Sequence, residues 1–147
     1  MTQKQLYVKP MPENILIDLN VVLDVLLERG GFIASRKILE LSEGNSHRLY
    51  ISAHFVTTFA YLLEEAKIPL TQIHSHIEWL IETFNVVPVD NLVLKNALKS
   101  RVKDYEDAVV EQTAIVCNAT TIITRNVKDF IASIIPASMP AEYLNAH

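Results

Sequence analysis

A short apolar run that ends in an acidic residue constrains the fold of this chain more than any other feature. Residues 15–17 read Ile-Leu-Ile, which is typical of a buried parallel strand. After Asn20 the apolar residues recur at helical spacing, so a helix is expected to begin there. Asp18 therefore leaves the carboxyl end of a strand and faces a helix start, the crevice where open α/β sheets bind ligands. The alternative is that Asp18 or Asn20 serves only as the helix N-cap.

The same alternation of strand and helix continues along the chain. Further strands are expected at 49–51, 86–87 and 121–124, with a short edge strand and a terminal turn within 134–144. Helices are expected at about 20–27, 34–43, 52–63, 71–81, 91–102 and 105–117. Strands that alternate with helices imply parallel pairing and helices on both faces. The sequence thus predicts a three-layer α/β/α sandwich around a short, mostly parallel central sheet.

Composition limits the classes of function. The 147 residues are half apolar and carry a net charge of −4, so no global basic field attracts nucleic acid. Any such contact needs a local basic patch or metal ions that invert the local sign. The single cysteine excludes an intrachain disulfide and fits a reducing compartment. With no signal segment and no apolar run of about 18 residues, a cytoplasmic location is expected.

A second acidic cluster opens the helix expected at 105–117. Asp104, Asp107 and Glu111 are spaced i, i+3 and i+7, so they share one helical face. Like charges at this spacing repel unless a cation or solvent offsets them. Each residue also has a structural interpretation: Asp104 as N-cap, Asp107 as an acidic group favoured by the helix dipole, and Glu111 as a solvated side chain.

Polar residues also follow the strand expected at 121–124. The segment 124–130 reads Thr-Arg-Asn-Val-Lys-Asp-Phe, and Arg125 and Lys128 are placed to meet phosphate. The alternative is a capped loop with solvated charges and Phe130 packed in the core. Because carboxyl ends of parallel strands share one edge, we expect Asp18, the Asp104/Asp107 pair and the Asn126/Asp129 loop to gather there.

Several carboxylates in one crevice are unfavourable unless divalent cations bind among them. Hard oxygen ligands select Mg²⁺ or Mn²⁺, and such ions activate water and stabilise the oxyanions of a phosphodiester displacement. With basic residues at the rim, metal-dependent phosphodiester hydrolysis is the most economical interpretation.

Four motifs in order resemble the PIN domain, the fold of many prokaryotic toxin ribonucleases. They are residues 15–24 (ILIDLNVVLD), 51–58 with Ile-Ser-Ala and Thr-Thr, 104–108 (DYEDA) and 124–130 (TRNVKDF). The resemblance covers about residues 14–144 and implies one PIN-like domain over 1–147. It further implies an acidic, Mg²⁺- or Mn²⁺-dependent site that hydrolyses RNA phosphodiester bonds.

The resemblance assigns roles to particular residues. The catalytic carboxylates it implies are Asp18, Asp104, Asp107 and Asp129. The metal ligands are Asp18, Asp107, Asp104 and Asn126, and the substrate contacts are Asn20, Thr124, Arg125 and Lys128.

The chain departs from the fullest family pattern at two positions. Most active PIN domains place a glutamate on the helix after the second strand, where this chain has Thr58, and Asn126 is neutral where many relatives have a carboxylate. Fewer carboxylates weaken cation affinity. A degenerate domain that binds RNA or protein without cleavage is therefore the alternative. A haloacid-dehalogenase-like phosphatase is disfavoured, because Asn20 stands where those enzymes place a second aspartate.

The resemblance also suggests partners: RNA, an antitoxin protein if the chain is a toxin, and a second copy of the chain. Trp79 is expected in the core with Ile73, Ile77 and Leu80, with self-association as its second role. Asp24 fits equally a group behind the site or a solvated helix residue. The histidines, His54 among them, show no metal-ligand spacing and are expected at the surface or an interface.

Overall fold

The computed structural model describes residues 6 and 8–147; of the predicted domain 1–147, residues 1–5 and 7 lie outside this description. Five parallel strands form one sheet in the order β3-β2-β1-β4-β5. The strands are β1 (Glu13–Ile17), β2 (His47–Ser52), β3 (Asn85–Val87), β4 (Thr121–Ile123) and β5 (Ala137–Ser138). The predicted α/β class and parallel sheet are confirmed.

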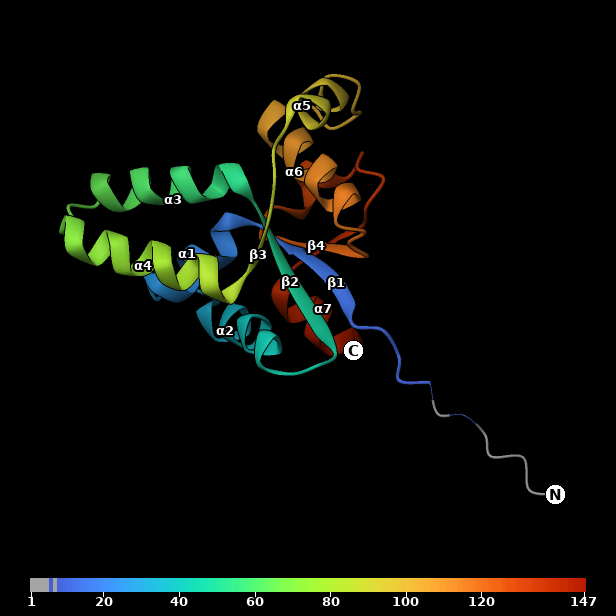
Figure 1. Ribbon diagram of the computed structural model, residues 1–147, viewed down its shortest axis with the longest axis horizontal. Helices are drawn as coiled ribbons and strands as arrows, with labels where there is room; N and C mark the ends of the chain where they lie inside the picture. Colours follow the sequence, from blue (N-terminus) through green and yellow to red (C-terminus); the bar gives the residue numbers. More distant parts are fainter. Residues whose placement is uncertain (1–5, 7) are drawn as a thin grey trace.

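Helices flank the sheet on both sides (Figure 1). On one side α6 packs against β1, β2 and β4 and carries α5 beside it, whereas α1 to α4 lie on the other side. The helices are α1 (Leu19–Leu26), α2 (Phe32–Glu40), α3 (Ala53–Glu65), α4 (Leu70–Thr83), α5 (Asn91–Ala97), α6 (Tyr105–Val116) and α7 (Pro140–Ala146). Two 3₁₀ turns complete the elements, η1 (Leu41–Glu43) and η2 (Val127–Phe130). No described helix has both the length and the apolarity that a membrane span requires.

The apolar run 15–17 lies in β1, the central strand of the sheet. All three of its side chains are completely buried, since β1 is paired with β2 on one edge and β4 on the other and is covered by helices on both faces. Burying apolar area contributes about 25 cal/mol per Å², so this strand and its neighbours Ile122 and Ile123 anchor the core.

Three of the differences from the predicted element boundaries have a clear local cause. Helix α5 ends at Ala97 rather than near 102, because the Ser100 hydroxyl accepts from the Val102 N–H at 3.1 Å and turns the chain away. Helix α2 begins at Phe32, with Gly31 as its N-cap at φ 87°, a left-handed conformation that glycine adopts without strain. The expected terminal turn is the helix α7, whose first residue is a proline, a position that proline favours.

The expected core position of Trp79 is wrong. Ile73 and Leu80 are buried, but Trp79 is 37% exposed and lies edge-on to Phe84 at 6.2 Å between ring centroids. Positions 73, 77 and 80 follow a helical stripe, whereas 79 is displaced by one residue and so by about 100° around the helix. The aromatic side chain therefore stands at the margin of the buried face.

Candidate active site

Strand register places Asp18 next to Thr124. Ile17 pairs with Ile123 across β1 and β4, and the Asp18 N–H donates to the Ile123 carbonyl at 2.9 Å. Asp18 and Thr124 directly follow these two strands. They therefore lie beside each other at the carboxyl edge of the sheet. This juxtaposition, between residues 106 positions apart, is the first element of the site.

Three groups hold the Asp18 carboxylate. Its Oδ2 accepts from the Thr124 hydroxyl at 2.7 Å and from the Asn20 side-chain amide at 3.3 Å. Its Oδ1 accepts from the Leu19 N–H at 2.8 Å. Asp18 is also the N-cap of α1, so the capping interpretation and the placement at the sheet edge both hold for the same side chain.

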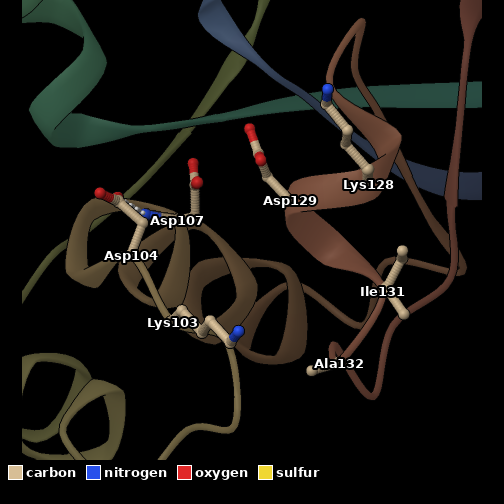
Figure 2. A pocket seen from close by; sticks show the side chains of 7 residues that line it. All are labelled: Lys103, Asp104, Asp107, Lys128, Asp129, Ile131 and Ala132. Atoms are coloured by element: carbon tan, nitrogen blue, oxygen red, sulfur yellow. Dashed lines mark hydrogen bonds between the residues drawn. The ribbon is translucent and has the colours of Figure 1, made fainter.

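The acidic start of α6 lies across a hollow from η2. Asp104 caps the helix, accepting from the Asp107 N–H at 3.0 Å. Figure 2 shows Asp107 from α6 and Asp129 from η2 extending into the same space, with Asp104 beside them and Lys128 at the rim. The hollow has a volume of about 460 Å³ and is lined by Lys103, Asp104, Asp107, Lys128, Asp129, Ile131 and Ala132.

Several carboxylates at this edge of the sheet raise one another's pKa. Burial and, in decreasing order, the carboxylates of Asp104, Asp18, Asp129 and Glu106 together raise the pKa of Asp107 to about 7. Burial also raises the pKa of Asp18, although the hydrogen bonds from Thr124 and Leu19 act against the shift. Protons or cations are therefore favoured here, and Asp18 and Asp107 belong to one electrostatic cluster.

The donor chemistry fits a hard divalent cation. Asp107, Asp129 and Asp104 present carboxylate oxygens to one hollow, and Mg²⁺ and Mn²⁺ prefer such ligands. The raised pKa of Asp107 results first from burial and then from the neighbouring carboxylates. Within residues 6 and 8–147, however, no three side chains of His, Cys, Asp or Glu form a ready-made metal cluster.

The other predicted contact residues have three different surroundings. Lys128 lines the hollow, with its side chain exposed. Asn20 and Thr124 instead contact Asp18, and the Asn126 backbone donates to the Thr124 hydroxyl at 3.0 Å while its side chain is exposed. The Arg125 guanidinium pairs with Asp24 at 2.7 Å.

Neither the electrostatic role of Glu106 nor the burial of Glu111 was predicted from the sequence. Glu106 was given no role, yet its charge raises the pKa of both Asp18 and Asp107. Glu111 shares a helical face with Asp104 but is buried, accepting from the Ser100 hydroxyl at 2.6 Å and the Ile134 N–H at 2.9 Å. Seven residues span about 10 Å of helix, so a common face did not imply a common site.

His54 is half-buried, so only part of this side chain lies at the surface. His54 lies at the start of α3, where its Nδ1 is 2.6 Å from the Ser52 hydroxyl. Its Nε2 is buried and has no hydrogen-bond partner among the residues that the structure describes, and burial lowers the pKa of the ring. Thr58, one turn later, uses its hydroxyl within the helix, donating to the His54 carbonyl at 3.1 Å.

Comparison with known proteins decides the family. The PIN domain family model matches residues 14–128, more than half of the chain. This chain belongs to the PIN-domain family. Among curated proteins, no sequence matches it.

Solved PIN-domain structures share the fold. FitAcB from Neisseria gonorrhoeae is 20% identical with a TM-score of 0.69, covering 86% of this chain and 98% of that chain. VapBC2 from Rickettsia felis, bound to a promoter DNA fragment, is 15% identical with a TM-score of 0.68 and the same coverage. A toxin–antitoxin complex from Klebsiella pneumoniae is 21% identical with a TM-score of 0.64, covering 86% of this chain and 97% of that chain. At these identities the likeness concerns the fold of this PIN domain.

Proposed function

We propose that this PIN domain is a divalent-metal-dependent ribonuclease, the toxin of a toxin–antitoxin pair. The observation that carries the proposal is that Asp104, Asp107 and Asp129 line one hollow, where burial and the neighbouring carboxylates raise the pKa of Asp107. Carboxylates held together without a compensating charge cost stability, and a cation offsets that cost. A site of this kind is suited to binding a cation and then a phosphate between the carboxylates and the basic rim.

The proposed function gives a specific role to each side chain of the site. Asp18, Asp104, Asp107 and Asp129 hold the cation, with Asn126 beside them. When bound, the divalent cation supplies Lewis-acid stabilisation of the charge that develops on the phosphate oxygens. Thr124 and Asn20 fix the orientation of the Asp18 carboxylate, and Lys128 meets the RNA backbone from the rim of the hollow.

The antitoxin is proposed from the solved relatives, which include the FitAcB and VapBC2 proteins and a toxin–antitoxin complex. An acidic cation-binding cleft is readily blocked by a partner that supplies a basic side chain. Co-expression with the product of the neighbouring gene should then yield a stable complex that does not cleave RNA. We also propose a homodimer, which sedimentation of the isolated chain would test.

A second function is favoured by three observations. The Thr58 hydroxyl is committed to its own helix, Asn126 is neutral, and the Asp104 carboxylate is engaged in capping. All three reduce the number of charged oxygens free for a cation. A PIN domain that binds RNA without cutting it is therefore the alternative.

RNA cleavage separates the two functions. Purified protein is incubated with a mixed pool of labelled RNAs in Mn²⁺ or in a chelator, beside Asp18→Asn and Asp90→Asn. Asp90 is the N-cap of α5, accepting from the Val93 N–H, and asparagine keeps a cap in both variants. Asp90 does not line the acidic hollow, so Asp90→Asn is a matched control.

The ribonuclease proposal predicts Mn²⁺-dependent cutting by the wild type and Asp90→Asn, and none by Asp18→Asn. Equal cutting by all three proteins would identify a contaminant. RNA retention without cutting by the folded wild type would favour the binding module.

A further inference from the structure

A buried carboxylate on α1 joins two arginines from different loops. Asp24 is 1% exposed, and its Oδ1 accepts from Arg125 Nη1 at 2.7 Å and from Arg29 Nε at 3.1 Å. Its Oδ2 accepts from the Ser35 hydroxyl at 3.3 Å. A buried carboxylate needs such partners, because an unpaired charge in the interior is costly. Asp24 is therefore an anchor point rather than a solvated helix residue.

Of the two arginines, only Arg125 reaches the site through its main chain. The Arg125 N–H donates to Asn20 Oδ1 at 3.3 Å. The amide of the same Asn20 side chain donates to Asp18 Oδ2 at 3.3 Å and approaches the Thr124 hydroxyl at 3.5 Å. An amide that accepts on one side and donates on the other has its orientation fixed. A continuous series of contacts thus runs from Asp24 to Asp18.

We propose that Asp24, acting through Arg125, is a positioning residue for Asp18. The ion pair fixes the loop after β4, and the Arg125 N–H then holds the Asn20 amide so that it donates to the Asp18 carboxylate. This inference rests on the proposed function only in taking Asp18 as the working carboxylate. It also changes the role of Arg125, whose guanidinium serves Asp24 rather than an RNA phosphate.

The chain supplies its own control in Arg29. Arg29 pairs with Asp24 as Arg125 does, and its second contact is to the Asn20 backbone carbonyl at 3.2 Å rather than to the side chain. The two arginine side chains are about equally exposed, at 40% for Arg29 and 39% for Arg125. Arg29→Gln and Arg125→Gln each leave Asp24 with one arginine, so both variants are expected to fold.

The first readout needs neither metal nor RNA. In the metal-free protein, NMR follows the side-chain amide of Asn20, whose exchange with solvent reports its hydrogen bond to Asp18. The proposal predicts at least tenfold faster exchange in Arg125→Gln and in Asp24→Asn, and wild-type exchange in Arg29→Gln. Equal acceleration in both arginine variants, or acceleration in neither, would overturn it.

The second readout is Mn²⁺ affinity, which separates positioning from a direct contact with RNA. Removing a nearby cation whose role is to touch phosphate should leave Mn²⁺ binding unchanged or strengthen it. Loss of positioning should weaken it about tenfold in Arg125→Gln and Asp24→Asn alike, with Arg29→Gln unchanged. Stronger or unchanged binding in Arg125→Gln would contradict the proposal. If the wild type binds no Mn²⁺, the proposed function loses its metal while the amide readout still decides this inference.

Discussion

The Thr124 hydroxyl donates a 2.7 Å hydrogen bond to Oδ2 of Asp18, joining the residues that directly follow the paired strands β1 and β4. Thr124 is completely buried, and its oxygen also accepts from the Asn126 N–H at 3.0 Å. One hydroxyl therefore orients the first-strand carboxylate and the start of the loop that leads to η2.

Removing the Thr124 hydroxyl should lower the free energy of unfolding. Thr124→Val keeps the shape of the side chain but removes the donor to Asp18 and the acceptor for the Asn126 N–H. We expect the pKa of Asp18 to rise further, and a loss of roughly 1–3 kcal/mol in unfolding free energy, because buried groups are left unpaired. Thr124→Ser retains the hydroxyl and should lose much less. Urea unfolding of the three proteins checks this, and equal stability of the Val and Ser variants would contradict it.

The stability of the metal-free protein should depend on pH through Asp107. Its pKa is raised to about 7 in the folded protein, whereas an unfolded aspartate titrates near 3.9. Between these values the folded state binds more protons, so unfolding free energy falls as pH rises and the penalty is complete above about pH 7.

Asp107→Asn should remove that penalty. After allowance for solvent screening we expect it to be more stable than the wild type at pH 8 by roughly 1–2 kcal/mol. At pH 4.5 the two should be nearly equal. Urea unfolding in a chelator at both pH values measures the difference, and a constant offset between the two proteins would show that Asp107 titrates normally.

Asp104 has two separable effects, on the helix and on charge. Asp104→Ala removes the α6 N-cap acceptor and should cost about 1 kcal/mol. Asp104→Asn keeps an acceptor but removes the second largest cause of the raised pKa of Asp107. We expect wild-type stability in the Asn variant with a lower pKa for Asp107, followed by NMR titration of its carboxyl carbon. An unchanged pKa would remove Asp104 from the electrostatic cluster.

Glu111 should matter for structure and not for cation binding. Its oxygens accept from the Ser100 hydroxyl and the Ile134 N–H, which ties α6 to the segment after α5 and to the segment after η2. Glu111→Ala leaves these donors unpaired and should cost roughly 2–4 kcal/mol. Gln112→Ala, at the neighbouring half-buried position, removes only one donor to the same carboxylate, at 3.2 Å, and should cost far less. Thermal unfolding compares the two, and equal losses would refute the anchoring role.

Part of the candidate site could be predicted because local sequence patterns mark the strands, the helices and their ends. The run 15–17 followed by Asp18 marks a buried parallel strand and its carboxyl end, and the order of elements implies that Asp107 and Asp129 meet it at the same edge. Asp104, Asp107 and Asp129 line one hollow, whereas Asp18 and Asn126 are not among its lining residues. These predictions needed only periodicity and the geometry of parallel sheets.

The remaining features depend on contacts that no local pattern contains. Arg125 meets Asp24 across 101 residues, and nothing in the sequence around Asp24 separates a buried anchor from a solvated helix residue. Trp79 is apolar and lies on an amphipathic helix. It is one residue away from the buried stripe of that helix, however, and so stands at the margin of the buried face. Burial and pairing at such positions are set by tertiary packing, which a single sequence does not specify.

Titration with Mn²⁺ by calorimetry tests the central claim most directly, namely that carboxylates from the end of β1, from α6 and from η2 together hold a divalent cation. The proteins are the wild type, Asp18→Asn, Asp107→Asn and Asp129→Asn, with Asp90→Asn as the control cap. The account predicts binding by the wild type and Asp90→Asn, weakened tenfold or more in each of the other three. No binding by the folded wild type, or binding that all three site variants retain, would contradict it.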